Sequence, residues 1–360
     1  MNTKRNKRQN VGIRLALTAL VIGLLVGVPQ AMAQSCCDKA TAKGAECTHP
    51  CCVEANLIGK ICFKCNSDKA TSCCDKAEGK GTLCAHPCCT DAYNIGKTCF
   101  KCNSDKVTSC CDKAEAKGGA CSHPCCVEAA SINSVCFKCN KSATAVPFRG
   151  DNLMAFLFKG DQSKSKWQVG QAVVSSDDPK MLSVTPTDTD GVMVNQSSKK
   201  NKSIDCYTKA KFGDCRIELE VMVPKGSNSG IYVMGEYEIQ VYDSYGVENV
   251  KGSDMGGIYG ASPPAVNASK APGEWQKYVI DFKAPRFDTT HGDHSHKTEN
   301  AKFVKVTLNG KVIHENVEMA GPTNGGVTGK EAATGPLMFQ GNHGSVAYRN
   351  IRITDLAGKL

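Results

Sequence analysis

The chain has 360 residues and a formal net charge of +9, and 23 of its residues are cysteine. This excess of basic residues is modest, which argues against nucleic acid as a partner. The sequence contains no glycine-rich phosphate loop, no Gly-x-Ser-x-Gly elbow and no nicotinamide-binding fingerprint, so we expect no nucleotide cofactor.

The first 33 residues have the three parts of a secretory signal peptide. Met1–Arg14 is basic, Leu15–Val28 is apolar but short for a bilayer span, and Ala31-Met32-Ala33 is a small-x-small cleavage signal. Cleavage after Ala33 would remove five basic residues and leave a formal charge of +4. We therefore expect a secreted or periplasmic protein, with an uncleaved anchor as the alternative.

Residues 35–141 contain a 37-residue repeat that occurs three times, over 35–71, 72–108 and 109–141. Each unit begins SCCDKA, continues through His-Pro-Cys-Cys and ends in Cys-x-x-Cys, with seven cysteines and one histidine. Few large apolar residues remain in each unit. Such a segment cannot bury enough apolar surface to fold unaided, so disulfides or metal ions must hold it together.

Two main interpretations of these cysteines are open, with a redox role as a third. Dense cysteine in an exported protein indicates disulfides, although an odd number leaves one thiol over in each unit. Seven thiolates and one imidazole would instead complete two tetrahedral metal sites, one with four thiolates and one with three thiolates and the imidazole. In the first unit these groups belong to Cys36, Cys37, Cys47, Cys51, Cys52, Cys62, Cys65 and His49. We expect the array to tether the protein to a cell wall, a matrix or a partner.

The stretch Asn140–Pro147 is short and polar and ends in proline, so we place a linker at 142–147 and a second domain at 148–357. Many short strand patterns with Gly, Pro and Asn turns predict an all-β sandwich or jelly roll, and Asn309-Gly310 predicts a hairpin turn. No stretch is typical of a long amphipathic helix. We predict strands over Gly191–Gln196, Cys215–Val223, Ser229–Met234, Tyr237–Tyr242, Glu274–Phe282, Phe303–Leu308, Lys311–Glu315, Gly335–Gln340 and Val346–Ile353.

The strand Tyr237–Tyr242 alternates strictly between apolar and polar residues. Ile239 and Val241 therefore belong to one face, and Glu238, Gln240 and Tyr242 to the other. Such a polar row can hold a sugar, and the alternative is a solvated outer face of the sandwich. The pattern Glu-x-Gln lacks the carboxylate pair of ordinary glycoside hydrolysis.

Several long motifs follow one another in the second domain: NSGIYV, YEIQVYDSYG, GGIYG, PGEWQKYVIDFKAPRFD, LNGKVIHEN and QGNHGSVAYRNIRI. In this order they resemble the family of 3-keto-disaccharide hydrolase domains, over roughly Val146–Leu356. The resemblance implies a concanavalin-A-like β-sandwich (jelly roll), here preceded by the small cysteine-rich triple repeat. It also implies cleavage of 3-keto-glycosides by lyase or hydrolase chemistry, and a separate oxidoreductase that supplies the 3-keto sugar.

This chemistry requires a base for the C2 hydrogen, an acid for the leaving group, and fixed donors or a divalent metal ion for the intermediate's charge. His343 is the first candidate, as base or metal ligand, although QGNHG departs from the family's commoner Gln-Asp-His-Gly. Glu238 is the second, as acid, base or metal ligand. The candidate substrate-binding residues are Gln240, Asp243, Asn228, Tyr259 and Arg286.

Each candidate has a structural alternative. His343 could be an ordinary loop histidine, Asp243 could only stabilise a turn, and Tyr259 could be core packing. Arg286 could pair with Asp288 on the surface. The function expected overall is an exported enzyme that cleaves 3-keto-glycosides. The alternatives are a non-catalytic carbohydrate-binding sandwich tethered by the array, and a metal-sequestering array with the sandwich as a scaffold.

Two further features concern cysteine and histidine. Cys206 and Cys215 are nine residues apart on strands that we expect to be neighbours, so a disulfide is predicted in an exported protein, with buried free cysteines as the alternative. His291, His294 and His296 form a cluster with Asp293, which we interpret as a solvated loop with incidental metal affinity.

Overall fold

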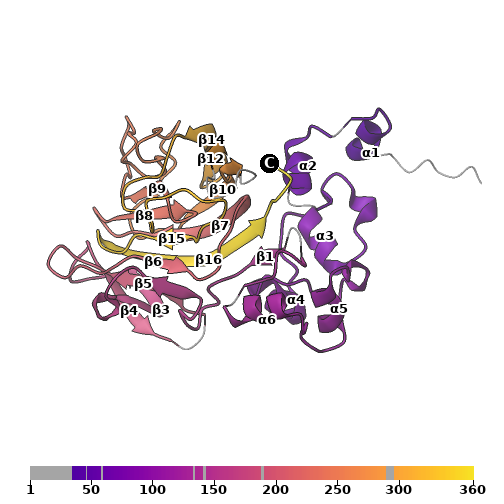
Figure 1. Ribbon diagram of the computed structural model, residues 1–360, viewed down its shortest axis with the longest axis horizontal. Helices are drawn as coiled ribbons and strands as arrows, with labels where there is room; N and C mark the ends of the chain where they lie inside the picture. The colour runs from indigo at the N-terminus through magenta and orange to yellow at the C-terminus, as the bar shows by residue number, and fades with distance from the viewer. Residues whose placement is uncertain are drawn as a thin grey trace, which may run out of the picture.

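The computed structural model describes residues 35–360 except 46, 58–59, 133, 141–142, 188–189 and 289–295. The predicted signal peptide and all of the histidine cluster except His296 lie outside the described residues. Figure 1 shows a group of short helices beside a β-sandwich. Within the described ranges, every helix is too short or too polar to serve as a transmembrane segment.

The cysteine repeats fold into pairs of short helices, which the sequence analysis did not predict. The first helix of a pair is capped by serine: the Ser72 side chain accepts a hydrogen bond from the N–H of Asp75, and the Asp75 side chain accepts one from the N–H of Ser72. The second helix begins at the proline of His-Pro-Cys-Cys. The first N–H groups of a helix have no acceptor within the helix, so a proline, which lacks an N–H, costs no hydrogen bond there. The elements are α1 (Cys36–Thr41), α2 (Pro50–Leu57), η1 (Ser67–Lys69), α3 (Cys73–Gly79), α4 (Pro87–Asn94), η2 (Ser104–Lys106), α5 (Cys110–Ala116) and α6 (Pro124–Ser131).

The rest of the chain is an antiparallel sandwich of a nine-stranded and a five-stranded sheet, with a two-stranded ribbon, so the all-β prediction is confirmed. The nine-stranded sheet has the order β14-β13-β10-β7-β16-β5-β3-β4, with β1 paired to β16. Its strands are β1 (Thr144–Ala145), β3 (Trp167–Val174), β4 (Leu182–Pro186), β5 (Val192–Gln196), β7 (Cys215–Met222), β10 (Gln276–Lys283), β13 (Ala301–Leu308), β14 (Lys311–Met319) and β16 (Ser345–Asp355).

The five-stranded sheet has the order β2-β6-β15-β8-β9, and it carries the residues on which the candidate site is built. A short 3-10 helix, η3 (Gln162–Lys164), precedes β3. The strands of this sheet are β2 (Phe156–Phe158), β6 (Cys206–Thr208), β8 (Asn228–Val233), β9 (Tyr237–Tyr242) and β15 (Met338–Phe339), and those of the ribbon are β11 (Arg286–Asp288) and β12 (His296–Glu299).

The hydrophobic core lies between the two large sheets. Tyr237 and Ile239 of β9 are fully buried there, and the ring centroid of Tyr237 lies 5.4 Å from that of Phe282 on β10. The rings of Phe339 and Tyr348 stack at 4.2 Å and join β15 to β16. Because alternate residues of a strand point to opposite faces, this core fixes which side chains of β9 face outward.

All nine strands predicted from the sequence are present. The strand predicted over Tyr237–Tyr242 matches β9 to the residue, whereas the one predicted over Gly335–Gln340 shortens to Met338–Phe339. Asn309 and Gly310 have φ values of 51° and 80°, as a tight hairpin turn requires. The sequence analysis missed β3, β4 and the short strands β1, β2, β6, β11 and β12.

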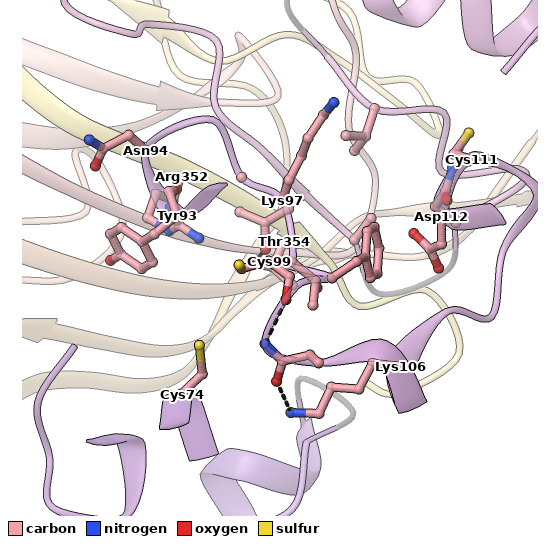
Figure 2. A pocket seen from close by; sticks show the side chains of 18 of the residues that line it. Cys74, Tyr93, Asn94, Lys97, Cys99, Lys106, Cys111, Asp112, Arg352 and Thr354 are labelled. Carbon is pink, nitrogen blue, oxygen red and sulfur yellow. Dashed lines mark hydrogen bonds between the residues drawn. The ribbon is translucent and has the colours of Figure 1, made fainter. Parts of the chain in front are cut away.

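The cysteine array packs on the outer face of the nine-stranded sheet. The guanidinium of Arg352 on β16 lies 3.9 Å from the ring centroid of Tyr93, and its Nη1 donates to the backbone oxygen of Tyr93 at 2.6 Å. Phe137 of the third repeat contacts Phe212 of the sandwich, with ring centroids 5.9 Å apart. Between the two parts lies a cavity of about 1600 Å³, and Figure 2 shows Tyr93, Arg352 and Thr354 on its wall.

Replacing Arg352 with alanine removes a cation–π contact and a hydrogen bond, together worth about 1–2 kcal/mol at a partly exposed site. We expect the array to separate from the sandwich more often, so that limited proteolysis cleaves the chain between the third repeat and β1 several-fold faster. Arg349→Ala is the matched control, because Arg349 lies 4.0 Å from the ring of Trp275 and pairs with Glu220 within the sandwich. Equal cleavage rates in the two variants would contradict this docking role.

Candidate functional site

The candidate site lies on the outer face of the five-stranded sheet, where β8 and β9 are neighbours. The register of these strands pairs Tyr232 with Glu238 and Gly230 with Gln240. Since Ile239 and the other inward residues of β9 are in the core, these four residues share the outer face. The polar row that the sequence predicted on this strand is therefore present.

Glu238 is the most unusual member of this row, because only 4% of its surface is exposed. Its backbone N–H donates to Oγ1 of Thr323 at 3.2 Å, and its backbone oxygen accepts from the N–H of Tyr259 at 3.0 Å. Loss of solvent raises the pKa of Glu238 to about 7, the charge of Asp205 adds to the rise, and hydrogen bonding by Tyr232 opposes it. Glu238 can therefore both accept and donate a proton near neutral pH.

Gly230 leaves the space that the carboxylate of Glu238 occupies. A Cβ atom at position 230 would clash with Oε1 of Glu238 and would lie 3.0 Å from Cε2 of Tyr232. Tyr232 is itself fixed, because its hydroxyl donates to the backbone oxygen of Asn324 at 3.0 Å. The requirement for glycine comes from this close packing of side chains and not from backbone conformation.

Asp205 and Lys159 complete the charged part of the site, and the sequence analysis missed both. Oδ2 of Asp205 lies 4.0 Å from Nζ of Lys159, which also donates to the backbone oxygens of Gly325 and Gly326 at 2.7 Å each. The charge of Asp205 acts on both Glu238 and His343. Asp205 is thus the charged group that the two predicted catalytic residues have in common.

His343 lies at the surface, in the loop between β15 and β16. Its Nδ1 is hydrogen-bonded to Oδ1 of Asn342. Partial burial lowers the pKa of His343, and the charge of Asp205 opposes this shift, so the imidazole is mostly neutral at pH 7. In the part of the chain that the structure describes, no hydrogen bond joins His343 to Glu238.

The loop that carries His343 packs closely against adjacent backbone, and its glycines make this possible. The N–H of Gly341 donates to Oδ1 of Asp205 at 2.9 Å. A Cβ atom at Gly341 would clash with the backbone of Ile204, and one at Gly344 would clash with Ser227 and Asn228. These glycines therefore bring the loop close to the protein's own backbone, and the position of His343 depends on that approach.

Three of the predicted substrate-binding residues lie on β8, on β9 or on the segment that pairs with β9. Nε2 of Gln240 donates to Oδ1 of Asn228 at 2.7 Å, so these two amides form a fixed pair on the outer face. Tyr259, whose backbone bonds to Glu238, has 46% of its surface exposed. Gln240 is only 5% exposed, so Asn228 and the exposed ring of Tyr259 are the members of this set that are open to a sugar.

The other two predicted substrate-binding residues have structural partners. The carboxylate of Asp243 accepts from the backbone N–H of Gly226 at 2.9 Å and from that of Tyr245 at 3.4 Å, which stabilises the turn after β9. Arg286 on β11 is bound to Asp214 by two hydrogen bonds, at 2.8 and 2.6 Å. The structure does not bring Arg286 to Glu238, and it pairs this guanidinium with Asp214 where the sequence analysis had considered Asp288.

The predicted disulfide between Cys206 and Cys215 is wrong in its premise. Cys206 lies on β6 of the five-stranded sheet and Cys215 on β7 of the nine-stranded sheet, so the strands are not neighbours. Both residues are fully buried free thiols. A short sequence separation suggested pairing, but the chain crosses from one sheet to the other between them.

Comparison with known proteins now identifies the family. The model of the 3-keto-alpha-glucoside-1,2-lyase-like domain matches residues 150–354. The chain belongs to this family. No curated protein matches it.

Among solved structures, two proteins from Parabacteroides distasonis named "putative glycosyl hydrolase" are similar to the chain. One is 28% identical, with 59% of this chain and 83% of that one covered and a TM-score of 0.44, and the other is 18% identical, with 59% and 93% covered and a TM-score of 0.39. A carbohydrate-binding module from Bacillus subtilis is 11% identical, with 52% and 95% covered and a TM-score of 0.26. Because these scores are low, family membership stands on the sequence match.

Burial of Glu238 predicts a pH-dependent cost to stability. At pH 4 the group is protonated in both the folded and the unfolded chain. As pH rises from 4.5 to about 7, only the unfolded chain ionises it, so the free energy of unfolding falls, by about 3 kcal/mol in total. We expect Glu238→Gln to match the wild type at pH 4 and to be more stable at pH 8, as measured by denaturant unfolding.

The matched control is Glu236, which is buried to the same extent two residues earlier. Its carboxylate accepts hydrogen bonds from the N–H groups of Thr328 and Gly329, at 2.8 and 3.0 Å. Glu236→Gln should therefore destabilise the protein at pH 8. Destabilisation of Glu238→Gln at pH 8 would show that the surroundings stabilise the ionised carboxylate of Glu238, which would contradict the prediction.

Proposed function

We propose that the protein is an exported enzyme that cleaves the glycosidic bond of 3-keto-glycosides by elimination, with net hydrolysis when water adds to the product. Glu238 carries this proposal: it is a buried carboxyl group with a pKa of about 7 on the polar face of a sandwich that belongs to this family. A group with this pKa is half ionised at neutral pH, which suits a general base.

The reaction begins at C2 of the sugar, whose hydrogen is acidified by the ketone at C3. The carboxylate of Glu238 takes this proton, and the electrons of the C2–H bond form an enolate with the C3 carbonyl. When the carbonyl re-forms, a C1–C2 double bond appears and the bond from C1 to the aglycone oxygen breaks. The aglycone leaves with that bonding pair and takes up a proton.

His343 supports the second half of this sequence. Its lowered pKa keeps the imidazole mostly neutral at pH 7, so it can relay a proton between the leaving oxygen and solvent at the rim of the site. When water adds across the C1–C2 double bond, the product is the free 3-keto sugar. The sum of the two steps is hydrolysis of the glycoside.

The enolate needs positive charge or hydrogen-bond donors near its oxygen. Lys159, held beside Asp205 by the backbone oxygens of Gly325 and Gly326, is a candidate. Asp205, Glu238 and His343 also present oxygen and nitrogen donors that suit a divalent cation. Such an ion, when bound, would be held by these three residues and would supply a Lewis acid for the carbonyl.

The substrate itself would lie across the outer face of the five-stranded sheet. The amides of Gln240 and Asn228 would bind sugar hydroxyls, and the exposed ring of Tyr259 would lie against the sugar's flat face. Because the sequence has no nicotinamide-binding fingerprint, a separate oxidoreductase would supply the 3-keto sugar. The N-terminal segment would direct export, and the array would tether the enzyme outside the cytoplasm.

Carbohydrate binding without turnover is the second candidate. It is favoured by the exposed ring of Tyr259 beside the fixed Gln240–Asn228 pair, an arrangement that binds sugars without needing an ionisable group. The two functions differ at Glu238. A binding module would keep its sugar affinity in Glu238→Gln, and the wild type would show no turnover.

We expect Glu238→Gln to lower kcat/KM for a 3-keto-glucoside by about 10²–10⁴-fold, since a general base contributes rate enhancement of this order. Aglycone release by the purified full chain is the measurement, with and without chelator. The wild-type kcat/KM should rise as pH increases through about 7, and this rise should vanish in the variant. Glu318→Gln, which alters an exposed carboxylate, is the control. Unchanged turnover in Glu238→Gln would refute the proposed base.

Gly230→Ala tests the position of the carboxylate without removing it. The added methyl group would displace Oε1 of Glu238, so we expect kcat to fall by about 10-fold or more while the far-UV circular dichroism spectrum is retained. Gly226→Ala is the control for a glycine close in sequence, since a Cβ atom there meets nothing within 4 Å and only its positive φ is strained. Wild-type kcat in Gly230→Ala would mean that the carboxylate position does not matter.

A further inference from the structure

The sulfur atoms of each cysteine repeat converge on one small volume. In the first unit, the Sγ atom of Cys52 lies 3.7 Å from that of Cys36 and 3.4 Å from that of Cys37, and the Sγ atoms of Cys47 and Cys36 are 3.4 Å apart. Cys52 is 5% exposed. In this structure all 23 cysteines are free thiols, so the neighbouring sulfur atoms are in contact without being bonded.

These distances fit a shared metal ion better than sulfur–sulfur bonds. A disulfide needs its sulfur atoms about 2.05 Å apart. Four thiolates in a tetrahedron around an ion at about 2.3 Å, the length of a zinc–sulfur bond, are about 3.8 Å from one another. The observed separations of 3.4–4.0 Å between neighbouring sulfurs lie around this value.

The first unit has two groups of four cysteines whose sulfur atoms all lie within 4.8 Å of one another, and Cys52 belongs to both; a third group of this kind joins His49 to Cys36, Cys52 and Cys65. Two tetrahedral sites that share one thiolate need seven thiolates, and each repeat has seven cysteines. One group consists of Cys36, Cys37, Cys47 and Cys52, and the other of Cys51, Cys52, Cys62 and Cys65.

We propose that each repeat holds two thiophilic metal ions bridged by one thiolate, that of Cys52, Cys89 or Cys126, so that the array binds six ions in all. Each thiol releases its proton as it binds an ion. This arrangement differs from the sequence interpretation, in which histidine completed the second site. His49 is exposed, with Nδ1 3.8 Å from the sulfur of Cys65, and it is not needed to complete either group.

The second and third repeats reproduce the geometry. The separation between Cys37 and Cys52, 3.4 Å, recurs as 3.4 Å between Cys74 and Cys89 and as 3.4 Å between Cys111 and Cys126. The three shared cysteines, Cys52, Cys89 and Cys126, are all buried. Three units with different surface residues thus keep one sulfur arrangement.

An asparagine beside the cysteines supports the thiolate form in the first and third repeats. Nδ2 of Asn66 donates to Sγ of Cys37, and Nδ2 of Asn140 donates to Sγ of Cys111, both at 3.3 Å. In the second repeat Lys106 donates to the side chain of Asn103, which in turn donates to the backbone oxygen of Cys99; Figure 2 labels Lys106 and Cys99 at the two ends of the dashed lines. An amide N–H aimed at sulfur is typical of the outer shell of a metal–thiolate site.

The ligand set restricts the class of ion. Thiolates select soft, thiophilic cations such as Zn²⁺ or Cu⁺ over hard, oxygen-seeking ions such as Mg²⁺ and Ca²⁺. Among the described residues of the array, half of the buried ones are cysteines, and Phe63 is the single large apolar side chain that is buried. Bound metal would therefore also supply much of the array's folding free energy.

Native mass spectrometry of the full chain, purified from the exported fraction under reducing conditions and loaded with Zn²⁺, tests the proposal. We expect six ions in the wild type. Cys47→Ser should lose one ion because Cys47 belongs to one group, and Cys52→Ser should lose two because Cys52 belongs to both. The unchanged second and third repeats act as internal controls for folding. Cys206→Ser, in the sandwich core, should keep all six.

Three results would overturn the proposal. The first is an exported protein that carries no metal and whose array cysteines are oxidised in pairs. The second is loss of a single ion from both Cys47→Ser and Cys52→Ser, which would exclude the bridging thiolate. The third is binding of nine ions that falls when His49 is replaced by alanine, which would make the imidazole a ligand of a third ion in each repeat.

Discussion

A buried carboxylate that is not fully hydrogen-bonded is the feature on which the sandwich site depends. Glu236 and Glu238 are equally buried, but the carboxylate of Glu236 accepts backbone hydrogen bonds from Thr328 and Gly329, whereas that of Glu238 accepts no backbone hydrogen bond among the described residues and is repelled by the charge of Asp205. The first glutamate fixes the loop over the site. The second keeps a proton affinity that a fully satisfied carboxylate would lose. The difference between structural support and reactive group therefore lies in hydrogen bonding and not in burial.

The array and the candidate site lie on opposite outer faces of the sandwich. Arg352 and Tyr93 join the array to the nine-stranded sheet, while Glu238 points outward from the five-stranded sheet. Two sheets that share one core each have a second face free for other purposes. The protein can thus be attached through the array without covering the face where a sugar would bind, and changes in one part need not alter the other.

The sequence predicted what depends on local pattern and missed what depends on distant contacts. Alternation placed Glu238 and Gln240 on one face of β9, and the core confirms that face because a shift of one residue would turn these polar side chains into the apolar core between the sheets. Asp205 gave no signal, since it comes more than 30 residues before Glu238 and reaches the site only through the β6–β15–β8 pairing. The predicted disulfide between Cys206 and Cys215 was wrong for the converse reason. The two residues are close in sequence, but the chain passes from one sheet to the other between them.

The interiors of the sandwich and of the cysteine array are stabilised in different ways. The sandwich packs rings such as Tyr237, Phe282 and Phe339 between its sheets, and this core needs no ligand. Each repeat instead gathers seven sulfurs around Cys52 or its equivalent, in a unit too short for an apolar core. An odd number of cysteines in each unit leaves one thiol over in a disulfide framework, either to pair between units or to stay free. The same number is complete when two ions share one thiolate, so the cysteine count and the sulfur geometry agree on one arrangement.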